Sequence, residues 1–233
     1  LSAPRTPFNR SLTSERSVAF STRPFEEFRR LRHHFGVTIN DVVLCATGLG
    51  LREYLIDVGE GVDRPLVASV PISVHGAAEA TSTNQVSTMF VELPVQLDEP
   101  LAVLAAVAGS SAASKEVNEA MGADLIGDVA ELVPGEVFSV GVDLYKRLGL
   151  ADRLPPVHNL VISNVPGPPF PLYLGGAELV AAYPMGPVMD GAGLNITVLS
   201  YRNHIDIGFM ADRDLVPDVW TLAEAVQPAF DEL

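Results

Sequence analysis

The side chains of this 233-residue chain that could move a proton are five histidines, one cysteine and many scattered carboxylates. A general base or a nucleophile needs a neighbouring group that orients or activates it. His33 and His34 are adjacent, but they fall at the end of a predicted surface helix, and the other histidines lack such a neighbour. Cys45 lies in an apolar helical pattern, and no Gly-x-Ser-x-Gly elbow occurs. The residues therefore offer no convincing general base, and a lone cysteine suggests no metal site.

Two polar residues, Asn40 and Asp41, open the mostly apolar run from Ile39 to Leu55. Thr38 followed by Asp41 resembles a capping box in which Asp replaces the usual Glu. Taken by itself, this pattern favours a structural role, in which the pair satisfies free amides in the first turn of a buried helix.

A proline-rich loop is the most unusual stretch of the chain. A short apolar strand is predicted to stop at Ser163-Asn164, and prolines follow at positions 166, 168, 169 and 171. Because proline fixes φ and lacks an amide donor, neither a helix nor a central strand is expected to pass through this stretch. Shaped loops on rigid scaffolds often carry binding work. A plain connector between two strands is the alternative.

The elements that position these residues alternate between period-2 and helical patterns, which predicts an α/β domain with a mixed sheet flanked by helices. Strands are expected near residues 16–22, 66–74, 85–93, 159–163, 177–183, 194–201 and 204–210, with a tight turn at Arg202-Asn203 between the last two. Helices are expected at 24–35, 39–55, 101–132 with a break near Gly122, 137–148 and 218–230. We expect residues 1–15 to form a linker or crossover arm and residues 16–233 to form one domain.

Six motifs occur in a fixed order along the chain. They are Asn40-Asp-Val-Val-Leu-Cys-Ala, Val70-Pro-Ile-Ser-Val-His, Asn84-Gln-Val-Ser-Thr-Met, Ser163-Asn-Val-Pro-Gly-Pro, Pro171-Leu-Tyr-Leu-Gly-Gly-Ala and Gly193-Leu-Asn-Ile-Thr-Val-Leu-Ser-Tyr. Together they resemble the C-terminal half of the bacterial wax ester synthase/acyl-CoA:diacylglycerol acyltransferase family, over essentially the whole chain. The chain departs from the family pattern at Cys45, at Thr83 and at His75, which replaces an arginine and so lacks its charged fork.

The resemblance implies a chloramphenicol-acetyltransferase-like fold, in which two halves enclose a channel. The family's general base is the second histidine of a His-His-x-x-x-Asp-Gly signature in the preceding half. His33-His34 does not match it, because Thr38 and Ile39 stand where Asp and Gly are required. The implied reaction transfers a long-chain acyl group from acyl-CoA to diacylglycerol or a long-chain alcohol. It needs no cofactor, because acyl-CoA is a substrate, and this chain alone is expected to be inactive.

The resemblance also implies roles for individual residues. It places Asn40 and Asp41 at the active site in supporting roles, with Asn40 as a donor to the developing oxyanion or as its organiser. Substrate contacts are then expected from the channel wall, the lipid-facing loop and the strand behind it: Ser163, Asn164, Pro166, Gly167, Leu172, Tyr173, Leu174, Asn195 and Tyr201. A simpler interpretation makes Asn195 and Tyr201 ordinary sheet residues.

Composition limits the partners. The chain carries a net charge of −14, which argues against nucleic-acid binding. Residues 1–34 nevertheless hold seven arginines against three glutamates, and this basic surface suits another domain, CoA phosphates or a lipid surface. The sequence contains no run of about 18 apolar residues, so no transmembrane helix is predicted. We expect a cytoplasmic protein, at a membrane or lipid-droplet surface, whose partner is the His-His-x-x-x-Asp-Gly half.

A different class of function stays open, namely a non-catalytic lipid-binding or scaffold domain without an enzymatic partner. Leu1 is not an initiator methionine, so the chain is expected to be a fragment or a processed piece. The two functions would be distinguished by whether the His-His-x-x-x-Asp-Gly signature is encoded upstream of Leu1.

Overall fold

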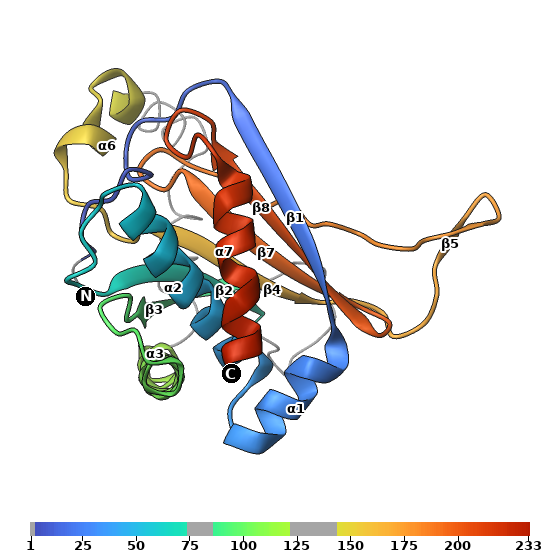
Figure 1. The fold of residues 1–233 in the computed structure, drawn as a ribbon. Helices are drawn as coiled ribbons and strands as arrows, with labels where there is room; N and C mark the ends of the chain where they lie inside the picture. Colours follow the sequence, from blue (N-terminus) through green and yellow to red (C-terminus); the bar gives the residue numbers. More distant parts are fainter. Residues whose placement is uncertain (1–2, 74–85, 122–143) are drawn as a thin grey trace.

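A six-stranded mixed sheet in the order β1-β8-β7-β4-β2-β3 forms the centre of the computed structural model, which describes residues 3–73, 86–121 and 144–233. The strands are β1 (Arg16–Pro24), β2 (Leu66–Ser73), β3 (Val86–Leu93), β4 (Leu160–Pro166), β7 (Leu194–Tyr201) and β8 (His204–Asp212). The helices are α1 (Phe25–Phe35), α2 (Ile39–Asp57), α3 (Pro100–Met121), α6 (Leu150–Arg153) and α7 (Val219–Glu232). The mixed α/β class predicted from the periodicity is confirmed (Figure 1).

The direction of the strands decides where their ends meet. β2, β4 and β7 are parallel neighbours in the middle of the sheet, whereas β3, β8 and β1 pair antiparallel at its two sides. The carboxyl ends of β2, β4 and β7 therefore lie together at one end of the sheet, which we call the carboxyl end.

Helices α2 and α7 cover one face of the sheet (Figure 1). Apolar side chains alternate along the strands toward this face, including Leu160 and Ile162 of β4. α2 is buried along most of its length, which explains why its sequence is apolar on nearly every side. α3 lies beside the edge strand β3, where Ser114 Oγ donates to Phe90 O over 2.6 Å. This helix protects an edge that would otherwise expose free backbone groups.

The second face of the sheet is covered by a chain segment, residues 179–192, rather than by a helix. The segment lies so close to β8 that a Cβ at Gly208 would overlap the carbonyl oxygen of Pro184. The Asp206 carboxylate is fully buried below it and accepts from Ala182 N over 2.8 Å. Polar side chains on this face of the strands are buried for the same reason: Ser69, Asn195 and Thr197.

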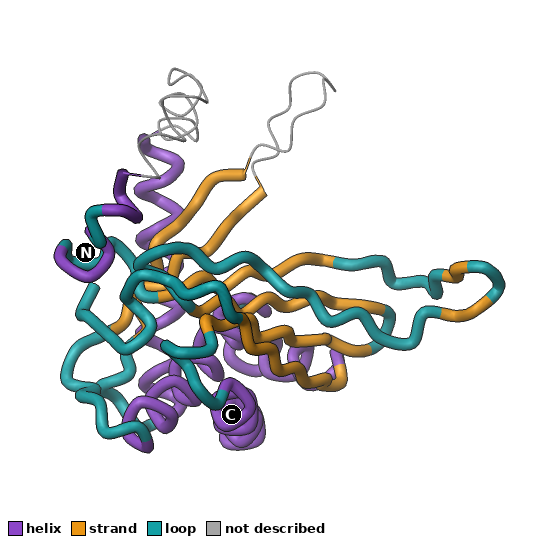
Figure 2. Tube along the Cα trace, turned by 90° about the horizontal axis from the view of Figure 1, so that it is seen from above, coloured by secondary structure: helices purple, strands orange, loops and turns teal. Residues whose placement is uncertain are grey.

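A projecting arm precedes this segment. β5 (Tyr173–Leu174) and β6 (Ala177–Glu178) pair across Gly175 and Gly176, whose φ angles of 58° and 86° suit glycine in a tight hairpin. Figures 1 and 2 both show the arm reaching beyond the sheet. At its base the Tyr201 hydroxyl accepts from Leu172 N over 2.9 Å and donates to Leu179 O over 3.1 Å. The arm is thus tied to β7 at both of its feet.

Two strand predictions are wrong in extent. The strand predicted at 159–163 continues to Pro166, because β4 pairs with β2 only through Leu160 and Val161 and then has β7 alone as its neighbour. A proline is tolerated where one side of the strand is unpaired. Of the strand predicted at 177–183, only Ala177–Glu178 is extended in a sheet. The amide of Ala182 is used by Asp206 instead of a neighbouring strand.

Two details at strand ends also differ. Pro24 ends β1, where it pairs with His204, and caps α1 instead of opening the helix. In the β7–β8 turn the positive φ of 53° belongs to Arg202 rather than Asn203. The predictions for residues 122–143, which include the break near Gly122 and most of the helix at 137–148, lie outside the described residues, as do the loop around His75 and Thr83.

Across the described residues, none of the helices has by itself the length and apolar character needed to cross a bilayer. Only α1 and α2 taken together meet that test, and they are bent by 102° at their junction.

Candidate functional site

The carboxyl end of the sheet gathers most of the residues that the sequence singled out. Because only residues 58–65 connect the end of α2 to the start of β2, the two elements run in opposite directions. The first turn of α2, with Asn40 and Asp41, therefore lies at the end of the sheet where β4 finishes and the proline loop begins. The two motifs, far apart in sequence, share one end of the fold.

Asp41 forms the predicted capping box. Its Oδ2 accepts from Thr38 N over 2.9 Å and from Thr38 Oγ1 over 2.7 Å, while Asp41 N donates to Thr38 Oγ1 over 3.1 Å. The residue is only 5% exposed, and its Oδ1 is buried without a hydrogen-bond partner among the described residues. One carboxylate oxygen thus serves the helix, and the other remains unused.

Asn40 occupies the position before Asp41 and is partly exposed. Within the described part of the chain its side chain makes no hydrogen bond. The capping interpretation therefore accounts for Asp41 but not for Asn40, whose amide is not used by any of the described residues.

The end of β4 separates two adjacent predicted residues. Side chains alternate along a strand, so Ser163 faces the second face of the sheet, whereas Asn164 follows Ile162 toward the helix-covered face. Beyond them, Gly167 N donates to Ser200 Oγ over 3.1 Å, and a Cβ at Gly167 would overlap Ser200 O. Pro166 pairs with the same residue of β7. This contact turns the chain toward the arm.

Ser163 and Asn195 meet in a cavity of about 380 Å³ between the second face of the sheet and residues 184–189, which we call the outer cavity. Asn195 Nδ2 donates to Pro187 O over 3.0 Å, and Thr197 Oγ1 donates to Asn195 Oδ1 over 2.7 Å. The lining consists of Ser69, Pro71, Thr88, Val161, Ser163, Pro184, Met185, Gly186, Pro187, Met189, Asn195 and Thr197. Asn195 therefore holds the covering segment in place, while Ser163 faces open space.

Sequence reasoning missed several of these lining residues. Side-chain alternation along β2 and β3 places Ser69 and Thr88 on the second face of the sheet, so the sequence could have revealed these polar residues. Met185 and Met189 gave no local signal, because only the fold of residues 179–192 brings them over the sheet.

Leu172 and Tyr173 lie on the arm, outside the outer cavity. Tyr173 is exposed, and Leu174 next to it is 87% exposed. Tyr201, predicted to stand behind them, is buried and anchors the base of the arm. The side chains of Leu172, Tyr173 and Leu174 on the arm are therefore exposed to solvent in this chain.

The histidines lie away from this region or are engaged otherwise. His33 and His34 are exposed at the end of α1. His204 Nε2 lies 3.4 Å from Asp206 Oδ2, but that carboxylate already accepts hydrogen bonds from Thr22 and Ala182. His204 does not line the outer cavity. His158, the fourth described histidine, packs beside Phe90, and burial lowers its pKa.

Burial also determines the chemistry of the lone thiol. Cys45 is fully buried on α2, and burial raises the pKa of its thiol to about 12. At neutral pH the thiol stays protonated and is a poor nucleophile. Nowhere in the described ranges do three His, Cys, Asp or Glu side chains cluster as they would around a metal ion.

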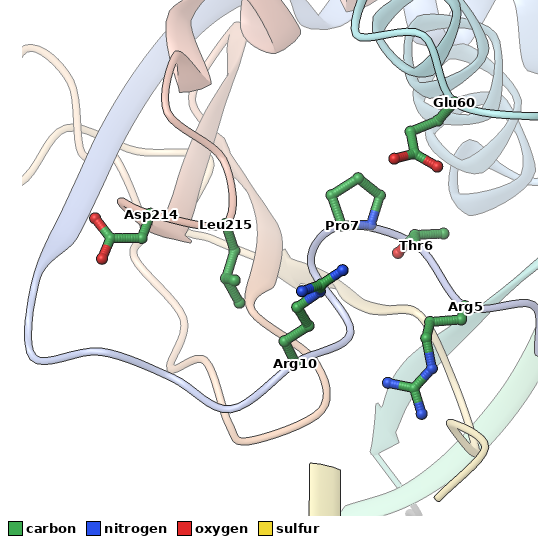
Figure 3. Close-up of a pocket in the computed structure, with 7 residues that line it drawn as sticks. All are labelled: Arg5, Thr6, Pro7, Arg10, Glu60, Asp214 and Leu215. Carbon is green, nitrogen blue, oxygen red and sulfur yellow. The ribbon is translucent and has the colours of Figure 1, made fainter. Parts of the chain in front are cut away.

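A second cavity of about 380 Å³ lies near the start of the chain (Figure 3). Its lining comprises Arg5, Thr6, Pro7, Arg10, Glu60, Asp214 and Leu215. Two arginines oppose two carboxylates there, and the Arg5 guanidinium already donates to the carbonyl oxygens of Asn9 and Ala151, each over 3.0 Å. Because this cavity has balanced charges and a structural arginine, we assign it no ligand.

Comparison with known proteins gives two family matches. The profile of the WS/DGAT C-terminal domain matches residues 82–233, and the profile of the wax ester synthase/diacylglycerol acyltransferase catalytic domain matches residues 1–43. Two Mycobacterium tuberculosis proteins, provisionally named diacylglycerol O-acyltransferases, are 34% and 33% identical over 100% and 99% of this chain. The matches cover 46% and 50% of those proteins, so the chain spans about half the length of the curated relatives it matches.

Solved structures agree on the fold. The wax ester synthase/diacylglycerol acyltransferase from Marinobacter aquaeolei VT8 matches with a TM-score of 0.77 and 27% identity, over 99% of this chain and 51% of that one. The PapA2 acyl transferase matches with a TM-score of 0.56 at 12% identity, over 98% of this chain and 46% of that one, and this likeness shows the fold alone. The matched domain, the named relatives and the shared fold agree with the motifs read from the sequence. The chain belongs to the wax ester synthase/diacylglycerol acyltransferase family and carries its C-terminal domain.

Proposed function

We propose that this chain is the C-terminal half of an O-acyltransferase that moves a long-chain acyl group from acyl-CoA to diacylglycerol or a long-chain alcohol. The observation that carries the proposal is the match of the C-terminal domain profile to residues 82–233, beside a catalytic-domain match that is limited to residues 1–43. The absence of a histidine suited to act as base among the described residues supports a division of labour between two halves.

In the proposed reaction the base comes from the other half. It takes the proton of the acceptor hydroxyl, the oxygen attacks the thioester carbonyl carbon, and the carbon–sulfur bond breaks. CoA leaves as a thiol that receives the proton. The negative charge that develops on the carbonyl oxygen needs a positioned donor. Asn40, with an unused amide at the carboxyl end of the sheet, is the donor that this chain offers.

Helix α1 offers a surface for the anionic part of CoA or for a lipid headgroup. Arg30 and Arg32 are exposed on it and form no ion pair within the described residues, whereas Arg29 is paired with Glu26 over 3.0 Å. Cationic side chains of this kind attract phosphates. The proposal includes no cofactor and puts the protein in the cytoplasm, at a membrane or lipid-droplet surface.

The test is complementation between two halves. Residues 1–233 are assayed alone with a long-chain acyl-CoA and diacylglycerol, and then together with a preceding half that carries His-His-x-x-x-Asp-Gly, and release of CoA is measured. We expect turnover only in the mixture. Robust turnover by residues 1–233 alone would overturn the division of labour, because one of its five histidines would then have to be the base.

A non-catalytic scaffold is the second candidate, favoured by the exposed apolar side chains of the arm. The same experiment separates the two functions. A mixture that associates but releases no CoA supports the scaffold and contradicts the acyltransferase.

A further inference from the structure

We propose that the outer cavity binds one uncharged aliphatic chain with an oxygen acceptor group, as in the ester of an acylglycerol. The choice of an acylglycerol as ligand rests on the proposed function. The presence of a binding site rests on the cavity alone.

The walls of the cavity suit a flexible chain. Its floor is the polar stripe of β2, β3, β4 and β7, and its roof is the segment from Pro184 to Met189. Met185 and Met189 are unbranched and adapt to ligands of irregular shape. A volume of about 380 Å³ falls at the lower end of the range of small-molecule sites, so the cavity fits one chain or part of one.

Charge restricts the ligand further. None of the twelve lining residues has an ionisable side chain. A phosphate or carboxylate placed there would lose its hydration without gaining a cation, which is costly. The charged part of CoA is therefore excluded from this cavity, and a neutral lipid chain is favoured.

The floor supplies hydrogen-bond donors that the protein itself does not use. The hydroxyls of Ser69, Thr88 and Ser163 line the cavity and make no hydrogen bond within the described residues. None of the three hydroxyl oxygens is closed off from solvent, so each can donate to a ligand that enters the cavity. Asn195 and Thr197 beside them are paired, so the three free hydroxyls mark the part of the floor left for a ligand's oxygen.

The roof is held in place, which makes the cavity a preformed site rather than a chance gap. A Cβ at Gly186 would overlap the Asn195 side chain, and Asn195 Nδ2 donates to Pro187 O over 3.0 Å. Behind them, Gly208 admits Pro184 against β8 in the same way. These close contacts, one with a side chain and one with backbone, thus fix the distance between roof and floor.

The experiment uses residues 1–233 and a monoacylglycerol whose acyl chain carries a photoreactive diazirine. After irradiation, the labelled residues are located by mass spectrometry. We expect labelling within residues 184–189, competed by unlabelled diacylglycerol but not by CoA. Failure to label this segment, or competition by CoA alone, would overturn the inference.

Three variants sharpen the result. Ser163→Leu fills the cavity from β4 and should reduce labelling at least about tenfold. Thr88→Val keeps the side chain's shape but removes a hydroxyl, and the loss of one hydrogen bond should weaken binding roughly two- to tenfold. Ser14→Leu, at an exposed position away from the cavity lining, is the matched control and should label as the unsubstituted chain does. Thermal unfolding of each variant verifies that it is folded.

Unchanged labelling in both Ser163→Leu and Thr88→Val would refute the site. Because labelling needs no acyl-CoA, it is separate from turnover. Labelling without any acyl transfer by the two-half mixture would leave the site standing and refute the proposed function. Acyl transfer by the mixture without any labelling of residues 184–189 would refute the site and leave the proposed function standing.

Discussion

At the scale of single residues, neighbouring polar side chains have divided roles. Asp41 is committed to the Thr38 capping box through one oxygen, whereas Asn40 has no partner among the described residues. The start of α2 requires only the first of these. The structure therefore separates a residue that stabilises α2 from one that is available for a ligand.

We expect Asn40→Ala to lower turnover of the two-half mixture far more than it lowers stability. Loss of an oxyanion donor costs about 3 kcal/mol in the barrier, on the order of a hundredfold in rate. Thr38→Ala is the matched control: it should cost about 1 kcal/mol of stability with little change in rate per folded molecule. Initial rates and urea unfolding measure the two effects. An Asn40→Ala variant that is less stable but equally active would show that the residue is structural.

His158 should make the chain acid-sensitive. Both of its ring nitrogens are buried without a hydrogen-bond partner in the described residues, and burial lowers its pKa below the ordinary value of 6.5. Below pH 6.5 the unfolded chain binds the proton more readily than the folded one, so the free energy of unfolding should fall as the pH is lowered.

The measurement is urea unfolding at pH 7.5 and 5.5. His158→Phe, which preserves a ring beside Phe90, should reduce the difference between the two pH values. An equal difference in the variant would assign the acid sensitivity to other groups.

At the scale of elements, the contact between α2 and α7 sets how closely the helical layer packs. A Cβ placed on Gly50 would lie 2.7 Å from Val226 Cα, whereas one on Gly48 would meet only Leu93 Cβ at 3.7 Å. The first distance is a clash with backbone, and the second is ordinary contact. Glycine at position 50 is therefore a requirement of packing, against its poor helix propensity.

We expect Gly50→Ala to lower the free energy of unfolding by about 1–3 kcal/mol, because the helices must move apart. Gly48→Ala, two residues away on the same helix, should be neutral or stabilising by up to about 1 kcal/mol. Denaturant unfolding of both variants checks the difference. Equal effects at the two positions would mean that α7 can shift without cost.

At the scale of the whole molecule, the two faces of the sheet are finished differently. Helices close one face and a chain segment covers the other, while the arm reaches beyond the sheet (Figure 2). Leu174 on the arm and Val180, just beyond the base of the arm, are exposed by 87% and 80%. Exposed apolar surface of this kind is typical of an interaction site.

We expect the chain by itself to self-associate through this arm and its base. The double variant Leu174→Asp/Val180→Asp should shift the sedimentation profile toward the monomer, because it introduces charges into the contact. Val157→Asp changes another exposed valine, 71% accessible and outside the arm, and should leave association unchanged. A profile that responds equally to both changes, or to neither, would show that the arm is not the contact.

The sequence by itself determined the local features. Periodicity identified β7 over its full length and located the start of α2, and the Thr38–Asp41 spacing predicted the capping box that the structure contains. Ordered motifs identified the family, which the comparisons confirm. These features are local, because each depends on residues a few positions apart or on a fixed order of short segments.

Tertiary structure decided the rest. It ended the predicted 177–183 strand at Glu178, since Asp206 takes the amide of Ala182 that a sheet neighbour would have used. It also placed Ser163 and Asn195 under the methionines of residues 184–189 and turned Asn164 to the other face. No pattern along the chain encodes these outcomes, because they depend on which backbone groups from distant segments meet in the folded protein.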